Sequence, residues 1–571
     1  MSNNIIPLKP VVIRDKRLRI KEDRDFAVYE GGEQITYNPF STTAFSNNYI
    51  TFNVKTPSPR VVLDRKIYIR YTIQLTFNPV ANPSNTKVLV SGHDAFRAFP
   101  LTSCMTSINL QINGVGITLN PEDIIHALLR YNTCEKVLDL DYSTAPSMLD
   151  KSQDYAQLYN TNRNPLAYYG DNGYQIGRGG FVIKSLVNTN TQAVLVAEIT
   201  EPLFVSPLNF GAGNSQGFVG VTELDVSINL SNLSRMWSHL TSTNGVVFNE
   251  QSIVPQISNP TLLLCYITPK EIFPIPTSVS YSYYFVRDIQ TNQGIVVPPN
   301  TTANLIMTNT QLASIPRRIF IYAERPRSGT GQKTLLTTDT FFSIESVSIT
   351  WNNINSVLAS ATKQDLYQIS KKNGCNLSWD EWSGENSPRF NSTPIGQNDT
   401  EITLTGSVLC LDMGEDIGLN SLLAPGVGGN YNLQVYVNVK NIHPTDSIAP
   451  TLHCVIVSEG AFTILNNTAI PSDAILSKVD VLNVSQMPET DLPPLDAFYG
   501  GSFWSKLKDI GSDVLKGFEK ALPVIKDIAD VGVKVAPLFA LGEGGCGNNQ
   551  ANPYMGGKRL PRSKMLKRLT N

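Results

Sequence analysis

The feature that most constrains the fold is an internal repeat of one strand–turn–helix unit. The first copy spans residues 104–131. It alternates apolar and polar residues as a strand, turns at Asn113-Gly114 and continues as a strand to Leu119. Asn120 followed by Pro121 then predicts the start of a helix. The apolar face expected for this helix comprises Ile124, Ile125, Leu128 and Leu129.

The same plan recurs over residues 341–372, with an alternating strand and an Asn-rich turn. The helix expected there has the apolar residues Val357, Leu358, Leu366 and Ile369. Three further pairs of segments repeat in the same order, 65–75 with 317–324, 221–230 with 431–440, and 261–269 with 451–459. Repetition of this kind predicts two β domains of the same design in one chain.

The fold class predicted is all-β, two consecutive jelly-roll sandwiches (a double jelly roll) with a C-terminal amphipathic helical segment. About eight strands per domain with few helices favour a sandwich. Long connections between non-adjacent strands favour the jelly roll over a simple meander. A pair of immunoglobulin-like domains is the alternative, and it fits less well because such domains are about half this size.

Composition shifts along the chain predict its division into parts. A charged N-terminal stretch is interpreted as an arm, and a proline-rich stretch at 268–278 as a stiff linker. A region rich in Asn, Asp, Tyr and Gly is interpreted as a surface insertion. The expected parts are the arm 1–24, the first jelly roll 25–270 with the insertion 132–180, the second jelly roll with its trailing linker 279–495, and a C-terminal segment 496–571.

The net charge and the spacing of the cysteines argue against a polyelectrolyte and against a disulfide-bonded protein. The net charge is −2 over 571 residues, so the chain as a whole is not a polyelectrolyte. Its seven cysteines form no CxxC motif, which predicts free, mostly buried thiols in a reducing compartment. Neither a signal peptide nor a run of about 18 apolar residues is found.

No motif in the sequence has the residues and the spacing of a catalytic, metal or cofactor site, so we predict that the chain is not an enzyme. The five histidines are scattered, and His126 is interpreted as a packing or capping residue. Residues 328–334 resemble a phosphate loop but lack the helix that would follow it. The acids of 412–418 could hold calcium, an interpretation that we disfavour. The residues WDEW, 379–382, are interpreted as an exposed aromatic loop.

The C-terminal segment combines an amphipathic helix with a basic tail. Three roles are open for this segment: it packs beneath the sandwiches, binds a membrane, or acts in assembly from the interior of the assembly. Because the helix is nearly neutral, the interior role is favoured. The tail is alternatively a nuclear-import signal or a solvated end. The apolar stripe of the helix 503–522 comprises Phe503, Trp504, Leu507, Ile510, Val514, Leu515, Phe518 and Leu522. The tail contains Lys558, Arg559, Arg562, Lys564, Lys567 and Arg568.

Several motifs resemble those of the major capsid proteins of virophages, small double-stranded DNA viruses that parasitise giant-virus factories. They are GHDAFRAFPLTS (92–103), which runs into the first strand–helix unit, EGGEQITYNPFSTTAFSNN (30–48), PSPRVVLDR (57–65) and LSRMWSH (233–239). The similarity covers most of the first repeat and is weaker over the second. It implies a double jelly-roll protomer that trimerises into a pseudo-hexameric capsomer. In some members it also implies a C-terminal segment removed by a viral cysteine protease.

The resemblance makes the linker before the helix a candidate cleavage region. Residues 488–501 are Pro-rich and acidic, so a protease could bind them as an extended strand. Viral proteases of the adenovirus type favour Gly-Gly sites. Gly500-Gly501-Ser502 is therefore the candidate, and Gly556-Gly557 is a weaker one. Cleavage after Gly501 would separate the sandwiches from the helix and tail.

We therefore predict a major capsid protein that self-assembles as homotrimers into an icosahedral shell, with interfaces that involve both sandwiches and the insertion 132–180. Its expected partners are other copies of itself, other capsid proteins such as pentons, a viral maturation protease, and viral genome or membrane through the C-terminal segment. The expected location is the virion, assembled in the host cytoplasm or viral factory. The alternatives are a jelly-roll module that binds carbohydrate or a receptor, and a capsid protein of another small virus with a membrane-lytic C-terminal peptide.

Overall fold

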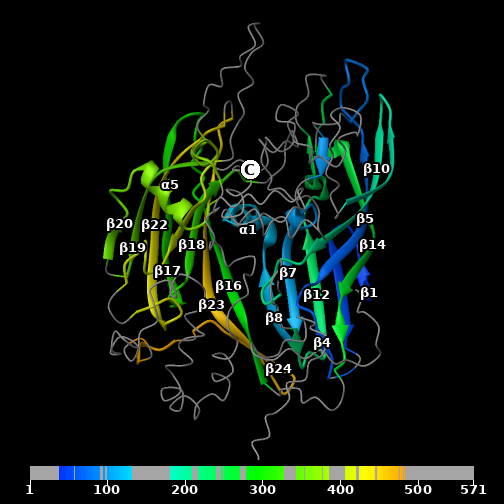
Figure 1. Cartoon of the computed structure of the whole chain (residues 1–571). Helices are drawn as coiled ribbons and strands as arrows, with labels where there is room; N and C mark the ends of the chain where they lie inside the picture. The colour runs from blue at the N-terminus through cyan, green and yellow to red at the C-terminus, as the bar shows by residue number, and fades with distance from the viewer. Residues whose placement is uncertain are drawn as a thin grey trace, which may run out of the picture.

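Two β sandwiches stand side by side in the computed structural model of the chain (Figure 1). The structure describes residues 38–56, 58, 60–89, 94–96, 99–131, 181–208, 217–239, 246–248, 250–269, 278–326, 342–352, 354–375, 377–384, 406–419, 423–443, 446–474, 476–479 and 481. The arm 1–24, the insertion 132–180 and the segment 496–571 lie outside these residues.

The first sandwich consists of two five-stranded sheets, in the orders β1-β14-β5-β10-β9 and β2-β3-β12-β7-β8. Two small sheets, β11-β4-β15 and β13-β6, accompany them. The strands are β1 Asn38–Ser41, β2 Ala44–Phe45, β3 Tyr49–Lys55, β4 Val62–Leu63, β5 Tyr68–Phe77, β6 Asp94–Phe96, β7 Met105–Ile112, β8 Val115–Leu119, β9 Phe181–Asn188, β10 Ala193–Pro202, β11 Phe218–Val219, β12 Glu223–Leu230, β13 Trp237–His239, β14 Ile253–Leu264 and β15 Tyr266–Ile267.

The second sandwich consists of the sheets β16-β23-β18-β21, with β24 also paired to β23, and β17-β22-β19-β20. Its strands are β16 Ser278–Asn292, β17 Thr302–Ser314, β18 Arg318–Glu324, β19 Ser343–Trp351, β20 Ile354–Val357, β21 Leu409–Asp412, β22 Gly428–Lys440, β23 Thr451–Leu465 and β24 Thr468–Ser472. The helices are α1 Pro121–Leu128, α5 Lys363–Lys372 and α6 Trp379–Ser383, with short 3-10 turns η2 Thr102–Cys104, η3 Leu129–Tyr131, η5 Leu233–Met236 and η6 Glu250–Ser252.

Both sandwiches have the strand order of a jelly roll. Of the eight principal strands in each, the first, eighth, third and sixth form one sheet, and the second, seventh, fourth and fifth form the other. The four repeated sequence units occupy matching places, β5 with β18, β7–β8 with β19–β20, β12 with β22, and β14 with β23. The double jelly roll predicted from the repeat is thus confirmed, and the immunoglobulin alternative is excluded.

The turn inside each repeated unit has the same construction. Asn113 and Gly114 have positive φ values of +49° and +80°, the conformation that an Asn-Gly hairpin requires. The Asn113 side-chain oxygen accepts a hydrogen bond from the Thr222 N–H at 2.8 Å, just before β12. In the second roll Asn352, with φ +51°, accepts one from the Asn432 N–H of β22 at 2.8 Å. Each asparagine therefore ties its hairpin to the neighbouring strand.

The helix predicted to include Val357 and Leu358 begins later than expected. Val357 ends β20, and Leu358 has a positive φ of +63°, which no helix accommodates. α5 begins only after Thr362, where the Thr362 hydroxyl accepts from the Asp365 N–H and the Asp365 carboxylate accepts from the Thr362 N–H. This capping box therefore sets the boundary. The other two residues assigned to this helix do lie on α5: Leu366 and Ile369.

The prediction that WDEW forms an exposed loop is wrong. These residues make up most of α6, and Ser378 and Glu381 form a second capping box at its start. The Trp382 ring is fully buried and donates from Nε1 to the Val408 carbonyl at 3.0 Å. Trp379 and Trp382 pack against Tyr367 of α5, so apolar burial holds this short helix on the sandwich.

Replacing either turn asparagine with alanine should destabilise the protein. We expect Asn113→Ala and Asn352→Ala each to lower the free energy of unfolding by about 1–3 kcal/mol, because a strand N–H loses its acceptor. Asn352→Asp retains the acceptor oxygen and should lose less. Denaturant unfolding of the three variants checks this, and an Asn113→Ala variant as stable as the parent would contradict it.

Candidate functional site at the seam between the rolls

The candidate functional site is the seam between the two rolls, the contact of residues up to Ile267 with residues from Ser278 onward. Figure 1 shows α1 and β8 of the first roll beside β16 and β23 of the second. One buried apolar cluster includes residues of both rolls, so no layer of solvent separates them. Polar contacts occur at three levels of this seam.

At one end, Arg65 of the first roll is buried against aromatic rings from both rolls. Its guanidinium carbon lies 5.4 Å from the ring centroids of Phe218 and Tyr281. Its Nε and Nη2 donate to the Pro207 carbonyl at 2.8 and 2.5 Å. Burial lowers the pKa of Arg65 to about 10, so the group remains a cation near neutral pH. The hydrogen bonds and the cation–π contacts offset part of the cost of burying this charge.

Tyr281 of β16 also fixes the position of the first roll directly. Its hydroxyl donates to the Gly217 carbonyl at 3.0 Å and accepts from the Val219 N–H at 2.8 Å. The ring packs edge-on against Phe218 at 5.0 Å between centroids. Burial raises the pKa of the Tyr281 hydroxyl, which therefore remains a neutral donor.

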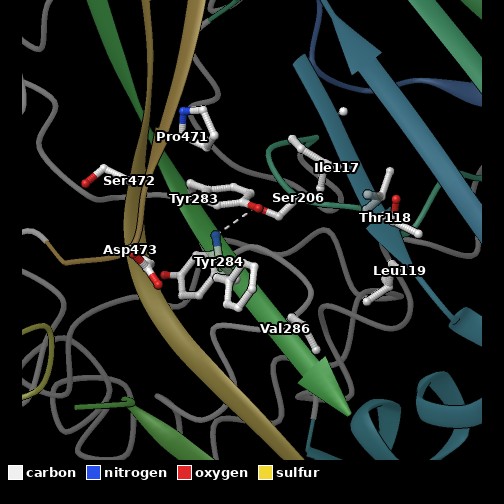
Figure 2. Close-up of a pocket in the computed structure, with 13 residues that line it drawn as sticks. Ile117, Thr118, Leu119, Ser206, Tyr283, Tyr284, Val286, Pro471, Ser472 and Asp473 are labelled. Carbon is white, nitrogen blue, oxygen red and sulfur yellow. Dashed lines mark hydrogen bonds between the residues drawn. The ribbon is translucent and has the colours of Figure 1, made fainter. Parts of the chain in front are cut away.

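At the middle level a cleft of about 280 Å³ opens between the rolls. Ser206 accepts a hydrogen bond from the Tyr284 N–H at 2.9 Å across it, as the dashed line in Figure 2 shows. β8 and β16, which line the cleft, each end a sheet. Its walls are Gly116–Leu119 of β8, Val205 and Ser206, Tyr283–Val286 of β16, and Pro471–Asp473.

At the other end, helix α1 of the first roll rests on the sheet of the second. The Tyr322 hydroxyl of β18 donates to the Asp123 carbonyl at 2.8 Å. Gln290 of β16 donates from Nε2 to the Asp123 carboxylate, also at 2.8 Å. Two strands of one roll therefore hold a single residue of the other.

Tyr131, directly after α1, completes this contact. Its ring packs edge-on against Phe320 at 5.2 Å, and its hydroxyl donates to the Val408 carbonyl. Burial raises the pKa of Tyr131 well above its usual value. The apolar body and polar tip of one side chain thus bind the same sheet.

Beneath α1 lies a buried charged centre. The His453 side chain is 2 % exposed, with Nδ1 3.0 Å from Asp288 Oδ2 and Nε2 3.4 Å from Glu324 Oε1. The Tyr322 ring stacks on the imidazole with centroids 4.9 Å apart. Burial alone would lower the pKa of His453, but Glu324 and Asp288 outweigh it and raise the pKa to about 10. His453 is therefore an imidazolium between two carboxylates.

Of the candidates drawn from the sequence, His126 is buried on α1. The stripe of 503–522, the basic tail, both Gly-Gly sites and the loop 328–334 lie outside the described residues. In 412–418, Asp412 pairs with Arg318 at 2.7 Å, and Asp416 accepts from the Asp412 N–H at 2.8 Å. Across the described ranges no group of three or more His, Cys, Asp or Glu is placed to hold a metal ion. The described helices include none long and apolar enough to cross a membrane.

Sequence reasoning missed the residues of the charged centre. His453 lies within the apolar, buried run of β23, so it is an ionisable residue that interrupts a buried pattern, whereas Asp288 lies in a mixed polar stretch of β16 that carries no such signal. That interruption was the available signal. It does not show which charges meet, because the three residues come from separate strands.

The chain matches two family models and a curated relative. The model described as Sputnik virophage major capsid protein 1st domain matches residues 7–266, and that described as Major capsid protein V20 C-terminal domain matches residues 285–460. The capsid protein V20 of Sputnik virophage is 32% identical over 597 residues, which cover 100% of both chains.

Solved structures agree with this. A chain of the Sputnik virophage structure determined by cryo-EM superposes with a TM-score of 0.71 and 33% identity, covering 87% of this chain and 99% of the other. The mavirus major capsid protein superposes with a TM-score of 0.61 at 15% identity, covering 79% and 92%, and so shares the fold.

Removing the Tyr281 hydroxyl should weaken the seam. We expect Tyr281→Phe to lower the free energy of unfolding by about 1–3 kcal/mol, because Gly217 O and Val219 N–H lose their buried partner. Tyr283→Phe is the matched control, since the Tyr283 hydroxyl makes no hydrogen bond within the described part of the chain. Denaturant unfolding compares them, and equal losses in the two variants would contradict the assignment.

Proposed function

The chain belongs to the family of Sputnik-type virophage major capsid proteins, and on this premise we propose that three copies assemble around a threefold axis into a capsomer. As a member of that family it forms the icosahedral shell of a virophage and is a component of the virion. Three double rolls present six similar lobes, which suit a curved hexagonal lattice. The division into an arm 1–24, rolls 25–270 and 279–495, and a C-terminal segment 496–571 is part of this proposal.

The observation that carries the trimer is a sheet face on the first roll that the described residues leave exposed. In the second roll every residue of β18 is buried, because the first roll covers the outer face of that sheet. The equivalent strand β5 alternates buried and exposed residues, and Arg70 and Gln74 are exposed on its outer face. A neighbouring copy that docks its second roll on this face would form, between two chains, the same kind of contact that the seam forms within one chain.

The helices α1 and α5 differ in exposure, as the strands β18 and β5 do. In α1 six of eight residues are buried, since the helix is enclosed between the rolls. In α5, the helix at the same place in the second roll, the buried residues are Lys363, Leu366 and Ser370. The remaining face of α5 is available to a second copy. A stable contact of this kind needs about 800 Å² of surface on each partner.

We propose that the C-terminal segment acts from inside the shell. Its apolar stripe binds neighbouring capsomers, and its basic tail binds viral genome. The viral maturation protease then cleaves after Gly501 and releases residues 502–571. Other capsid proteins such as pentons complete the shell, and a membrane is the alternative target of the stripe.

Charge reversal on the exposed sheet face of the first roll should weaken the trimer. We expect Arg70→Glu to raise the trimer dissociation constant roughly tenfold, equivalent to about 1.4 kcal/mol, because a contact that forms around the Arg70 cation would have to bury a carboxylate instead. Lys87→Glu is the matched control, since Lys87 is exposed on the loop after β5. Analytical ultracentrifugation measures both. A wild-type chain that is monomeric at micromolar concentration, with no particles on concentration, would contradict the trimer.

Blocking the candidate cleavage site should leave a full-length chain in the particles. We expect the wild-type protein of purified virions to end at Gly501, and Gly501→Val to prevent this because a branched side chain obstructs a narrow protease groove. Gly556→Val is the control at the weaker site. Intact mass measurement decides, and a full-length wild-type chain throughout would rule out the cut. Normal particles from a chain lacking 502–571 would rule out the assembly role.

A further inference from the structure

His453 lies between the two side chains that bind α1. In the sheet β16-β23-β18, His453 is directly opposite Gln290 on one side and Tyr322 on the other. Directly opposite residues of neighbouring strands point to the same face, so the three side chains form a row beneath α1. The outer two members of this row are the residues that hold Asp123.

The imidazole contacts both outer members of the row, one directly and one through a carboxylate. The Tyr322 ring lies flat on it, with an interplanar angle of 4°. On the other side, His453 binds Asp288 Oδ2 at 3.0 Å, and the same oxygen accepts from Gln290 Nε2 at 2.9 Å. Two short chains of contact therefore connect His453 to Asp123 of the first roll.

We propose that protonated His453 is the positioning residue that docks α1 on the second roll, so that loss of its charge opens this end of the seam. The Asp288 and Glu324 side chains, 7 % and 9 % exposed, would then face each other without a cation between them. Asp288 Oδ1 is buried and has no hydrogen-bond partner in the described part of the chain. Removing the cation from a buried ion pair is strongly destabilising.

The charged and titratable groups around this row come from α1, β16, the end of β18 and the segment between β22 and β23. Asp123 of α1 adds a third carboxylate to Asp288 of β16 and Glu324 of β18. Just after β18, Arg325 pairs with Asp446 at 2.8 Å, and His443 lies 3.7 Å from the same carboxylate. Arg325 is therefore engaged elsewhere. If His453 were neutral, Tyr322 and Gln290 would lie among three carboxylates that repel one another.

The direction of the pH dependence follows from the raised pKa. Because the pKa of His453 is about 10 in the folded protein and near 6.5 when unfolded, its stabilising contribution is complete below about pH 6.5. That contribution is lost progressively as the pH rises to about 10. The contact of α1 with the second roll is therefore closed at neutral pH and opens at alkaline pH.

Hydrogen exchange in α1, followed from pH 7 to pH 10 in the full-length protein, tests this proposal. After correction for intrinsic exchange, we expect the protection of residues 121–128 to fall as the pH rises. In His453→Gln we expect protection at pH 7 to be roughly tenfold lower and nearly independent of pH. His453→Lys, which restores a cation, should recover part of it.

His443→Gln is the matched control, because His443 is also buried in the second roll and burial lowers its pKa. It should retain the wild-type pH profile of α1. A His453→Gln protein with wild-type protection of α1 would overturn the proposal, as would a loss of protection equal in α1 and in β19. If His453→Gln does not fold, hydrogen exchange of the wild-type protein from pH 7 to pH 10 still decides. Protection of α1 that stays unchanged up to pH 10 would also overturn the proposal.

Discussion

The structure depends on polar and charged groups buried between two apolar sandwiches. Apolar contact alone is non-directional and would allow one roll to slide over the other. Hydrogen bonds from Tyr281, Tyr284 and Tyr322 to main-chain or hydroxyl groups of the first roll have defined geometries. Each lies at a different level of the seam. Together they permit one relative position of the rolls.

This arrangement explains why equivalent elements have different surfaces. α1 is buried on almost all sides because both rolls enclose it, whereas α5, built from the same repeat, keeps an exposed polar face. β18 and β5 differ in the same way. The contact between the rolls thus gives equivalent elements of the duplicated module different exposure within one chain.

Local sequence patterns predicted the elements that depend on local interactions. The Asn113-Gly114 hairpin follows from the requirement for positive φ, and the start of α1 follows from Asn120-Pro121. The boundary of α5 was misplaced because Val357 and Leu358 carry apolar side chains at helical spacing, although the capping box at Thr362 lies further on. The burial of Trp382 was missed because a short aromatic motif does not reveal the sheet that covers it.

The sequence by itself determined the duplicated jelly roll, because alternation and turn chemistry act between residues near each other in the chain and recur in both copies. Only the tertiary structure decided how the two copies meet. Asp288, Glu324 and His453 come from three strands, and Asp123 comes from the other roll. Their charges interact because the sheet aligns those strands and α1 lies across them. No spacing in the sequence encodes a contact that arises from the packing of separate elements.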